Sequence, residues 1–154
     1  MNKKIGIMAI ALVLFTCLTS CMSTGEVGQY GLETEETIAL NLTKDPYVGM
    51  LFVTHVNGES TGAYFSKSDW KYINPLYIKL NGRPIIFTIL CPVVVGYSRG
   101  GPVIQYRTAE LRLTKLADIN AGDVLTLKWM YQTQTFAFMD ATGNIVQQTI
   151  PAFN

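Results

Sequence analysis

The chain has 154 residues, of which 15% are charged and 49% are apolar. This length suits one domain with its own hydrophobic core, and the low charge content argues against a disordered or coiled-coil chain. The formal net charge of +1 includes Lys3 and Lys4 near the N-terminus; without them, ten basic residues face eleven acidic ones. Nucleic-acid binding needs a clustered excess of Lys and Arg, so we expect no nucleic-acid partner.

The first twenty residues have the organisation of an export signal. Lys3 and Lys4 form a positive segment, and residues 5–18 form a largely apolar stretch of 14 residues. A bilayer span needs roughly 20 apolar residues, so this stretch fits a signal peptide rather than a transmembrane helix. We therefore expect residues 1–20 to be removed on export.

The signal ends in the residues Leu18-Thr19-Ser20-Cys21. This run resembles the lipobox of bacterial lipoproteins, in which an aliphatic residue and two small residues precede the modified cysteine. The resemblance implies cleavage after Ser20 and a thioether-linked diacylglycerol on Cys21. An ordinary secretory signal with an incidental cysteine is the alternative.

A lipid on Cys21 would attach the chain to a membrane without spanning it. We expect this covalent lipid, no other cofactor, no metal ion, and a location in the cell envelope. In Gram-negative lipoproteins an aspartate after the cysteine favours the inner membrane. Met22 stands there instead, which favours the outer membrane.

Residues 21–36 read as a lipidated, flexible tether between the anchor and the domain. They contain Gly25, Gly28 and Gly31 among four glutamates, with almost no periodic apolar pattern. Such a composition is typical of a linker. The folded domain is then expected over residues 37–154.

From Thr37 onward, short alternating apolar runs separated by turn residues predict about seven or eight β-strands. They cover residues 37–43, 48–57, 76–80, 83–95, 103–114, 124–132, 136–140 and 145–150. No window of a dozen residues carries a helical stripe. The sequence therefore predicts an all-β fold, a small antiparallel β-sandwich.

Turn residues divide these strands. Asn81-Gly82 predicts a hairpin turn, and the glycine-rich residues 96–102 predict a loop. Pro92 marks a bend, because proline cannot donate a hydrogen bond to a neighbouring strand. Residues 66–73 are expected to form a turn or one short helix.

Two of these turns carry a family resemblance. Val56-Asn57-Gly58 with Gly62, and Leu80-Asn81-Gly82 further on, resemble turns of PEGA-type domains and similar small bacterial lipoproteins. The proline that usually follows the first turn is missing, and Pro75 comes late. The resemblance implies an immunoglobulin-like or transthyretin-like sandwich, in families whose members mostly lack a known activity.

The reactive side chains form no recognisable constellation. Cys91 lies in an apolar run, which predicts a buried thiol of low reactivity. His55 is the single histidine and has no acidic, thiol or histidine partner nearby in the sequence. We therefore expect no catalytic residues.

Five aromatic residues crowd one stretch of the chain and form the best candidate binding patch: Tyr64, Phe65, Trp70, Tyr72 and Tyr77. Rings beside polar groups can stack on sugars or bury themselves in a partner. The alternative is that these rings cover one end of the sandwich.

These observations favour a non-enzymatic, membrane-anchored module that binds an envelope protein or glycan, or supports envelope structure. The runner-up is a carrier of a small apolar ligand, lined by Phe87, Trp129, Phe136 and Phe138. A small hydrolase, resting on His55 alone, is the third possibility.

Overall fold

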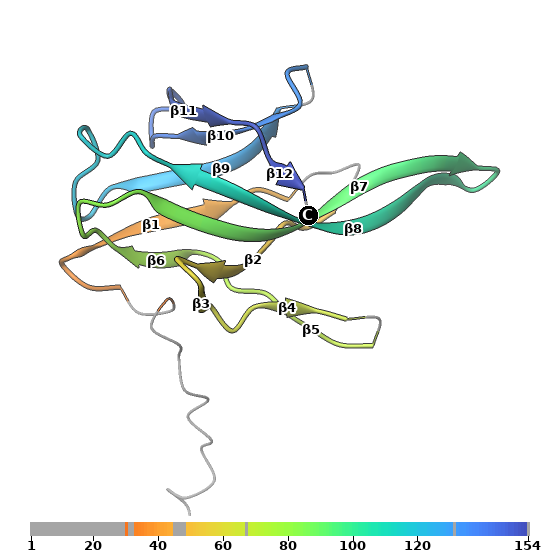
Figure 1. Cartoon of the computed structure of the whole chain (residues 1–154), viewed down its shortest axis with the longest axis horizontal. Coiled ribbons are helices and arrows are strands. Elements are labelled where there is room, and N and C mark those ends of the chain that lie inside the picture. The colour runs from red at the N-terminus through yellow and green to blue at the C-terminus, as the bar shows by residue number, and fades with distance from the viewer. Residues whose placement is uncertain (1–29, 31–32, 45–48, 67, 131, 154) are drawn as a thin grey trace, which may run out of the picture.

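The chain folds into an all-β sandwich, shown in Figure 1. Its computed structural model describes residues 30, 33–44, 49–66, 68–130 and 132–153. The strands within these residues are β1 (Thr37–Leu42), β2 (Phe52–Val56), β3 (Glu59–Ser60), β4 (Tyr64–Phe65), β5 (Trp70–Lys71), β6 (Leu76–Lys79), β7 (Ile85–Ser98), β8 (Gly101–Leu113), β9 (Val124–Met130), β10 (Thr135–Met139), β11 (Ile145–Thr149) and β12 (Ala152–Phe153). Every strand expected from the sequence is present, and four two-residue strands that were not expected, β3, β4, β5 and β12, are added to them.

Two five-stranded sheets form the layers. The first has the order β11-β10-β9-β1-β6 and the second the order β12-β8-β7-β2-β3, while β4 and β5 pair with each other as a separate hairpin. Neighbouring strands are antiparallel except β1 and β9, which run parallel with Leu40 beside Leu125. This confirms the expected sandwich, with one parallel pairing inside it.

The core lies between the two sheets because alternate side chains of each strand point inward. Ile38, Leu40 and Leu42 of β1 face the interior, as do Phe87 and Ile89 of β7. Each such side chain contributes roughly 1.5–3 kcal/mol by leaving water. The alternation that predicted the strands therefore also determines which of their faces is buried.

One predicted turn forms and another connects different elements than expected. Asn57 and Gly58 both have positive φ, 52° and 84°, as the two-residue turn between β2 and β3 requires. Asn81-Gly82 was expected to close a hairpin, but it leads from β6 in the first sheet to β7 in the second. Only Gly82 of this pair has positive φ, so Asn81-Gly82 does not form the two-residue hairpin turn that Asn57-Gly58 forms.

The expected loop over residues 96–102 is mostly strand. β7 continues to Ser98 and β8 begins at Gly101, so the turn is confined to Arg99 and Gly100. Gly96 sits where the pairing register shifts, a bulge that interrupts neither strand. Its glycine therefore marks a bulge, which composition alone does not distinguish from a loop.

The described part of residues 66–73 contains a turn and the strand β5, so the turn was the correct one of the two expectations and the short helix was not. The Ser66 backbone N–H donates to the Asp69 carbonyl oxygen at 2.7 Å, and the Asp69 N–H donates to Ser66 Oγ at 3.0 Å. These bonds close a tight turn between β4 and β5. Ser66 therefore stabilises a turn rather than capping a helix.

The β7–β8 hairpin extends well past its neighbours (Figure 1). In the described sheet, β2 pairs with β7 as far as Leu90, and β12 pairs with β8 at Ala109 and Glu110. Beyond these positions no other described strand pairs with β7 or β8. We call residues 92–106 the arm, and the rest of the sandwich the body.

The packed structure includes Tyr30, inside the stretch expected to be a tether. Its ring belongs to the core, and its hydroxyl donates to the Val56 carbonyl oxygen at 3.2 Å and to Glu59 at 3.1 Å. In the described part of the chain, no helix has the length and hydropathy needed to cross a bilayer. Cys21 and the signal lie outside the described residues.

Candidate functional site

An apolar cleft opens between the two sheets at the base of the arm. β1, β9 and β10 have their ends there, while β7 continues outward into the arm. Because these strands end before β7 does, side chains do not fill the whole space between the inward faces of the two sheets. The remaining space has a volume of about 550 Å³, within the range of about 300–1,000 Å³ that is usual for small-molecule sites.

Most of the cleft is lined by apolar and aromatic groups. Trp129 continues the inward row of Leu125 and Leu127 on β9, and its ring lies 4.8 Å from that of Phe136 on β10. The lining residues are Thr43, Lys44, Gly49, Leu51, Cys91, Pro92, Val93, Val94, Tyr97, Lys128, Trp129, Gln134, Phe136 and Phe153. Such a surface can hold an apolar ligand.

Positive charge borders the cleft. Lys44, just past the end of β1, and Lys128, on β9, are among its lining residues, and the lining residues that the structure describes include no acidic side chain. Neither lysine forms an ion pair with a described residue. An acidic group at one end of a bound ligand would therefore meet a favourable charge.

Cys91 lies on the cleft wall and is buried, as predicted from its apolar surroundings. Burial raises the pKa of its thiol to about 11. Its Sγ donates to the Arg107 carbonyl oxygen at 3.6 Å. The neutral thiol contributes an apolar surface rather than a nucleophile at physiological pH.

The four residues proposed for a carrier's ligand site separate into two pairs. Phe87 and Phe138 are fully buried, with ring centroids 5.5 Å apart, so they form part of the packed core. Trp129 and Phe136 reach the cleft. The sequence thus identified one wall of the cleft and assigned to it two rings that fill the interior instead.

The predicted aromatic patch also separates. Tyr64, Phe65 and Trp70 lie on the β4–β5 hairpin and are all exposed, Trp70 by 54%. Tyr64 donates a hydrogen bond to Asp69, which with burial and charge repulsion raises the pKa of the Tyr64 hydroxyl. Tyr72 is partly buried against the core, and its hydroxyl donates to the Leu42 carbonyl oxygen at 3.3 Å.

The hairpin is held to the second sheet by rings that pack on that sheet's outer face. Phe52 is fully buried although it lies outside the main core, with its ring 5.5 Å from Phe65 and 5.6 Å from Tyr72. Tyr106, at the base of the arm, stacks on Phe65 with a centroid separation of 4.3 Å. Phe65 and Tyr72 therefore have a structural role, and Tyr64 and Trp70 are the two rings of the hairpin that are more exposed than Phe65.

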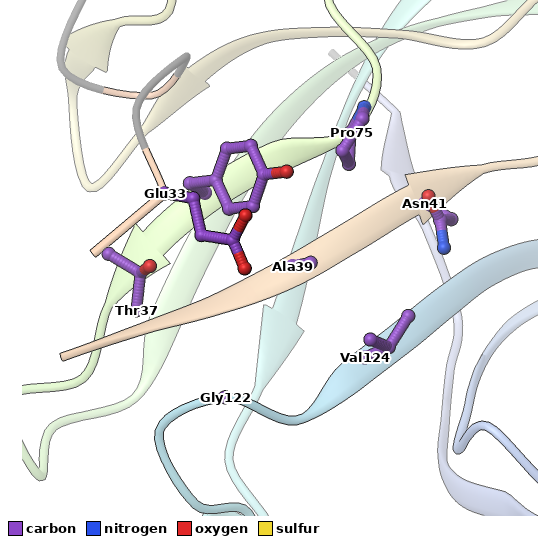
Figure 2. Close-up of a pocket in the computed structure, with 8 residues that line it drawn as sticks. Glu33, Thr37, Ala39, Asn41, Pro75, Gly122 and Val124 are labelled. Atoms are coloured by element: carbon purple, nitrogen blue, oxygen red, sulfur yellow. The ribbon is translucent and has the colours of Figure 1, made fainter. Parts of the chain in front are cut away.

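Tyr77 lies elsewhere, at a shallow hollow on the outer face of the first sheet. Ala39 pairs with Tyr77 on one side and Val124 on the other, so a small side chain lies between two larger ones. Figure 2 shows Ala39 at the floor of this hollow, with Glu33 and Val124 around it. Its volume of about 230 Å³ is less than half that of the cleft, and it is the weaker candidate.

His55 is exposed on β2, and its Nδ1 lies 3.1 Å from the hydroxyl oxygen of Thr54. Its register partners are Ser60 on β3 and Thr88 on β7, neither of which is acidic. Among the described residues, no group of three or more His, Cys, Asp or Glu side chains could hold a metal ion. Among the described residues, the hydrogen-bond and register partners of His55 include no carboxylate.

Sequence reasoning missed the aliphatic wall of the cleft, Val93 and Val94. Both were placed in a continuous apolar strand, where burial on both faces is the usual expectation. The available signal was Pro92, which marks the position where β7 leaves the body.

Comparison with known proteins gives no match, whether by protein-family model, by curated sequence or by solved structure.

Proposed function

We propose that this chain is a lipid-anchored, non-enzymatic binding protein of the bacterial cell envelope, and that the cleft at the base of the arm is its ligand site. The observation that carries the proposal is the cleft itself, about 550 Å³ lined mainly by apolar groups. Apolar concave sites with a few polar groups are the usual form of small-molecule sites. The cleft favours the carrier hypothesis over a purely structural role.

The ligand class follows from the lining. Trp129, Phe136 and Val93 provide an apolar wall, and Lys44 provides a cation at the border. A molecule with an apolar body and one acidic group matches both features. The envelope, with its lipids and lipid precursors, is rich in such amphiphiles.

A fluorescent fatty acid, cis-parinarate, tests the cleft directly. The purified protein should bind it saturably with one site per chain. Val93→Trp, which fills the cleft, should weaken binding at least tenfold, whereas Val103→Trp, at an arm position outside the lining, should leave it unchanged. Equal binding by Val93→Trp and wild type would show that the probe binds elsewhere.

The charge at the border has its own control. Lys44→Glu should weaken binding of cis-parinarate several-fold, because it replaces an attractive charge with a repulsive one. Lys115→Glu makes the same charge change at an exposed position outside the lining. If both variants weaken binding equally, the effect comes from overall charge and Lys44 has no specific role.

The anchor is tested independently of the cleft. Cys21→Ala should abolish metabolic labelling with palmitate and move the protein out of the detergent phase. Labelling that persists in this variant would mean that the lipid is not on Cys21. Neither outcome affects the cis-parinarate experiment, so the two parts of the proposal can fail separately.

A further inference from the structure

The arm exposes apolar side chains on both of its faces. Val103 and Ile104 are neighbours in β8, so they point to opposite faces, and they are 45% and 39% exposed. Tyr97, near the tip, is 84% exposed. A ribbon of two strands is marginally stable alone in water, and an uncovered apolar surface of this kind usually marks a contact.

The charge of the arm indicates what it contacts. Residues 92–106 contain no acidic residue and one basic residue, Arg99, which lies in the turn at the tip. Tyr97 and Pro102 pair next to this turn. A cation with an aromatic ring beside it suits the headgroup region of an anionic bilayer, where tyrosine rings and basic side chains both concentrate.

The chain length places a bilayer within reach. Tyr30 is fixed in the core and lies nine residues after Cys21. An extended chain spans at most about 3.3–3.6 Å per residue, so a lipid on Cys21 keeps Tyr30 within about 30 Å of the membrane surface. Tyr30 bonds Val56, which pairs with Phe87, so Tyr97 lies ten residues further along β7, about 33 Å away. The tip of the arm therefore reaches the surface when the long axis of the molecule is inclined toward the membrane. This step rests on the proposed lipid anchor.

We infer that the arm docks on the surface of the anionic membrane to which the lipid anchors the protein. Tyr97 and the apolar side chains of the tip enter the interfacial layer, with Arg99 among the phosphates. The depth is limited, because the outer edges of both arm strands carry backbone groups that no described strand pairs. Such groups are costly in hydrocarbon and are satisfied at the hydrated interface.

Docking in this way also orients the cleft. Pro92, Val93, Val94 and Tyr97 belong both to the arm and to the lining of the cleft. With the tip of the arm in the interfacial layer, the cleft at the base of the arm is close to the membrane surface, so an amphiphile leaving the bilayer has a short path to it. The bilayer is therefore the source of the ligand that the proposed function requires.

The test places a fluorescent reporter at the tip of the arm. In the mature lipidated protein Cys21 is acylated and Cys91 is buried, so Tyr97→Cys supplies one reactive thiol. After labelling with an environment-sensitive dye, the protein is reconstituted on vesicles of phosphatidylethanolamine and phosphatidylglycerol. The emission should shift to shorter wavelength and be quenched several-fold by brominated lipids.

A matched control reports on the body. Ala121→Cys puts the same dye on an exposed turn between β8 and β9, at the end of the body away from the arm (Figure 1). Its emission should stay that of a dye in water. Adding Arg99→Glu to Tyr97→Cys should reduce quenching on the anionic vesicles, while adding Lys115→Glu should not.

A dye at position 97 that remains in water on vesicle-bound protein overturns the arm proposal and leaves the anchor intact. Failure of the protein to float with vesicles overturns the anchor and the arm proposal together, while cis-parinarate binding, measured without vesicles, still decides the cleft. Shielding that depends on protein concentration and not on vesicles would show that a second copy covers the arm. That result also overturns the proposal.

Discussion

The two halves of the β7–β8 hairpin show how little an apolar strand says about its own burial. In the body, Ile89 pairs with Ala109 and both are fully buried. In the arm, Val94 pairs with Ile104 in the same ladder, yet Ile104 is 39% exposed. The difference is in the neighbours, since the body half has β2 beside it and the first sheet beneath it.

Whether the apolar side chains of a strand are buried depends on the elements packed against that strand and not on its own sequence. Residues 85–95 form one nearly continuous apolar run, bent at Pro92, of the kind expected of a central strand. Half of it serves the core, and the other half carries an apolar surface away from the body. Variants that treat the two halves alike should therefore have very different effects.

The largest contrast comes from two aromatic residues of the same strand. Phe87 is fully buried in the body, and Tyr97 is 84% exposed in the arm. We expect Phe87→Ala to lower the free energy of unfolding by about 3–5 kcal/mol, because it leaves a cavity in the core. Tyr97→Ala should change it by about 0.5 kcal/mol or less. Urea unfolding of both variants measures the difference, and similar losses would mean that the arm is part of the cooperative core.

The buried side-chain amide of Gln147, on β11, forms hydrogen bonds that connect the body half of β8 to the first sheet. Gln147 Oε1 accepts hydrogen bonds from the backbone N–H groups of Thr114, at 2.8 Å, and Lys115, at 2.9 Å. Its Nε2 donates to the Arg112 carbonyl oxygen at 2.6 Å. The described part of the arm has no such link to the first sheet.

Removing this tie should cost less than removing a core ring. Gln147→Leu leaves these backbone groups without their partner, so we expect a loss of about 1–3 kcal/mol in the free energy of unfolding. Gln148→Leu, at the exposed neighbouring position, should be nearly neutral. Thermal or urea unfolding of the pair gives the comparison, and equal stabilities would show that water replaces the amide fully.

The fold was largely readable from the sequence because the alternation of apolar residues is local. Each expected strand is present, and the turn at Asn57-Gly58 forms because both residues accept positive φ. The position of Asn81-Gly82 between two sheets was not readable, because sheet membership depends on contacts far along the chain. The sequence does not reveal that the body ends at Cys91, for the same reason.

The candidate site was harder to foresee than the fold. Trp129 and Phe136 were named for a ligand site, but the cleft exists because several strands end together, and strand ends are the least local feature of a sheet. Tyr77 was grouped with Trp70 by its distance along the chain, and the fold places it at a different hollow. Proximity in sequence was a poor guide to a shared surface.

Cys91 lies at the boundary between the body half and the arm half of the hairpin, so the ionisation of its thiol reports whether this position is buried. Because burial raises the pKa of Cys91 from 9.0 to about 11, the folded state holds the thiol proton more tightly than the unfolded chain does. The stabilisation from the neutral thiol is therefore complete below pH 9.0 and lost as the pH rises toward about 11. Unfolding measured over this range should show a steeper decline for wild type than for Cys91→Ala.

The same burial controls reactivity. A thiol reagent at neutral pH should modify native Cys91 slowly and the unfolded protein rapidly. Rapid modification of the native protein would place the thiol in open solvent and move the end of the body toward Phe87. An arm variant outside the cleft lining, such as Val103→Ala, should leave the native rate unchanged.

The smallest effect is expected on the second exposed ribbon, β4–β5. Trp70 is 54% exposed and, unlike Phe65, is not stacked on Tyr106. Truncating a buried ring costs about 3–5 kcal/mol, whereas surface substitutions usually stay within about 0.5 kcal/mol. We therefore expect Trp70→Ala to leave the melting temperature almost unchanged, and Phe65→Ala to lower it clearly, because Phe65 covers Phe52. A large drop for Trp70→Ala would make this ring structural and remove it as a contact for any partner. A small drop would place it with Tyr97, as a ring that folding does not require and that is available to something outside the chain.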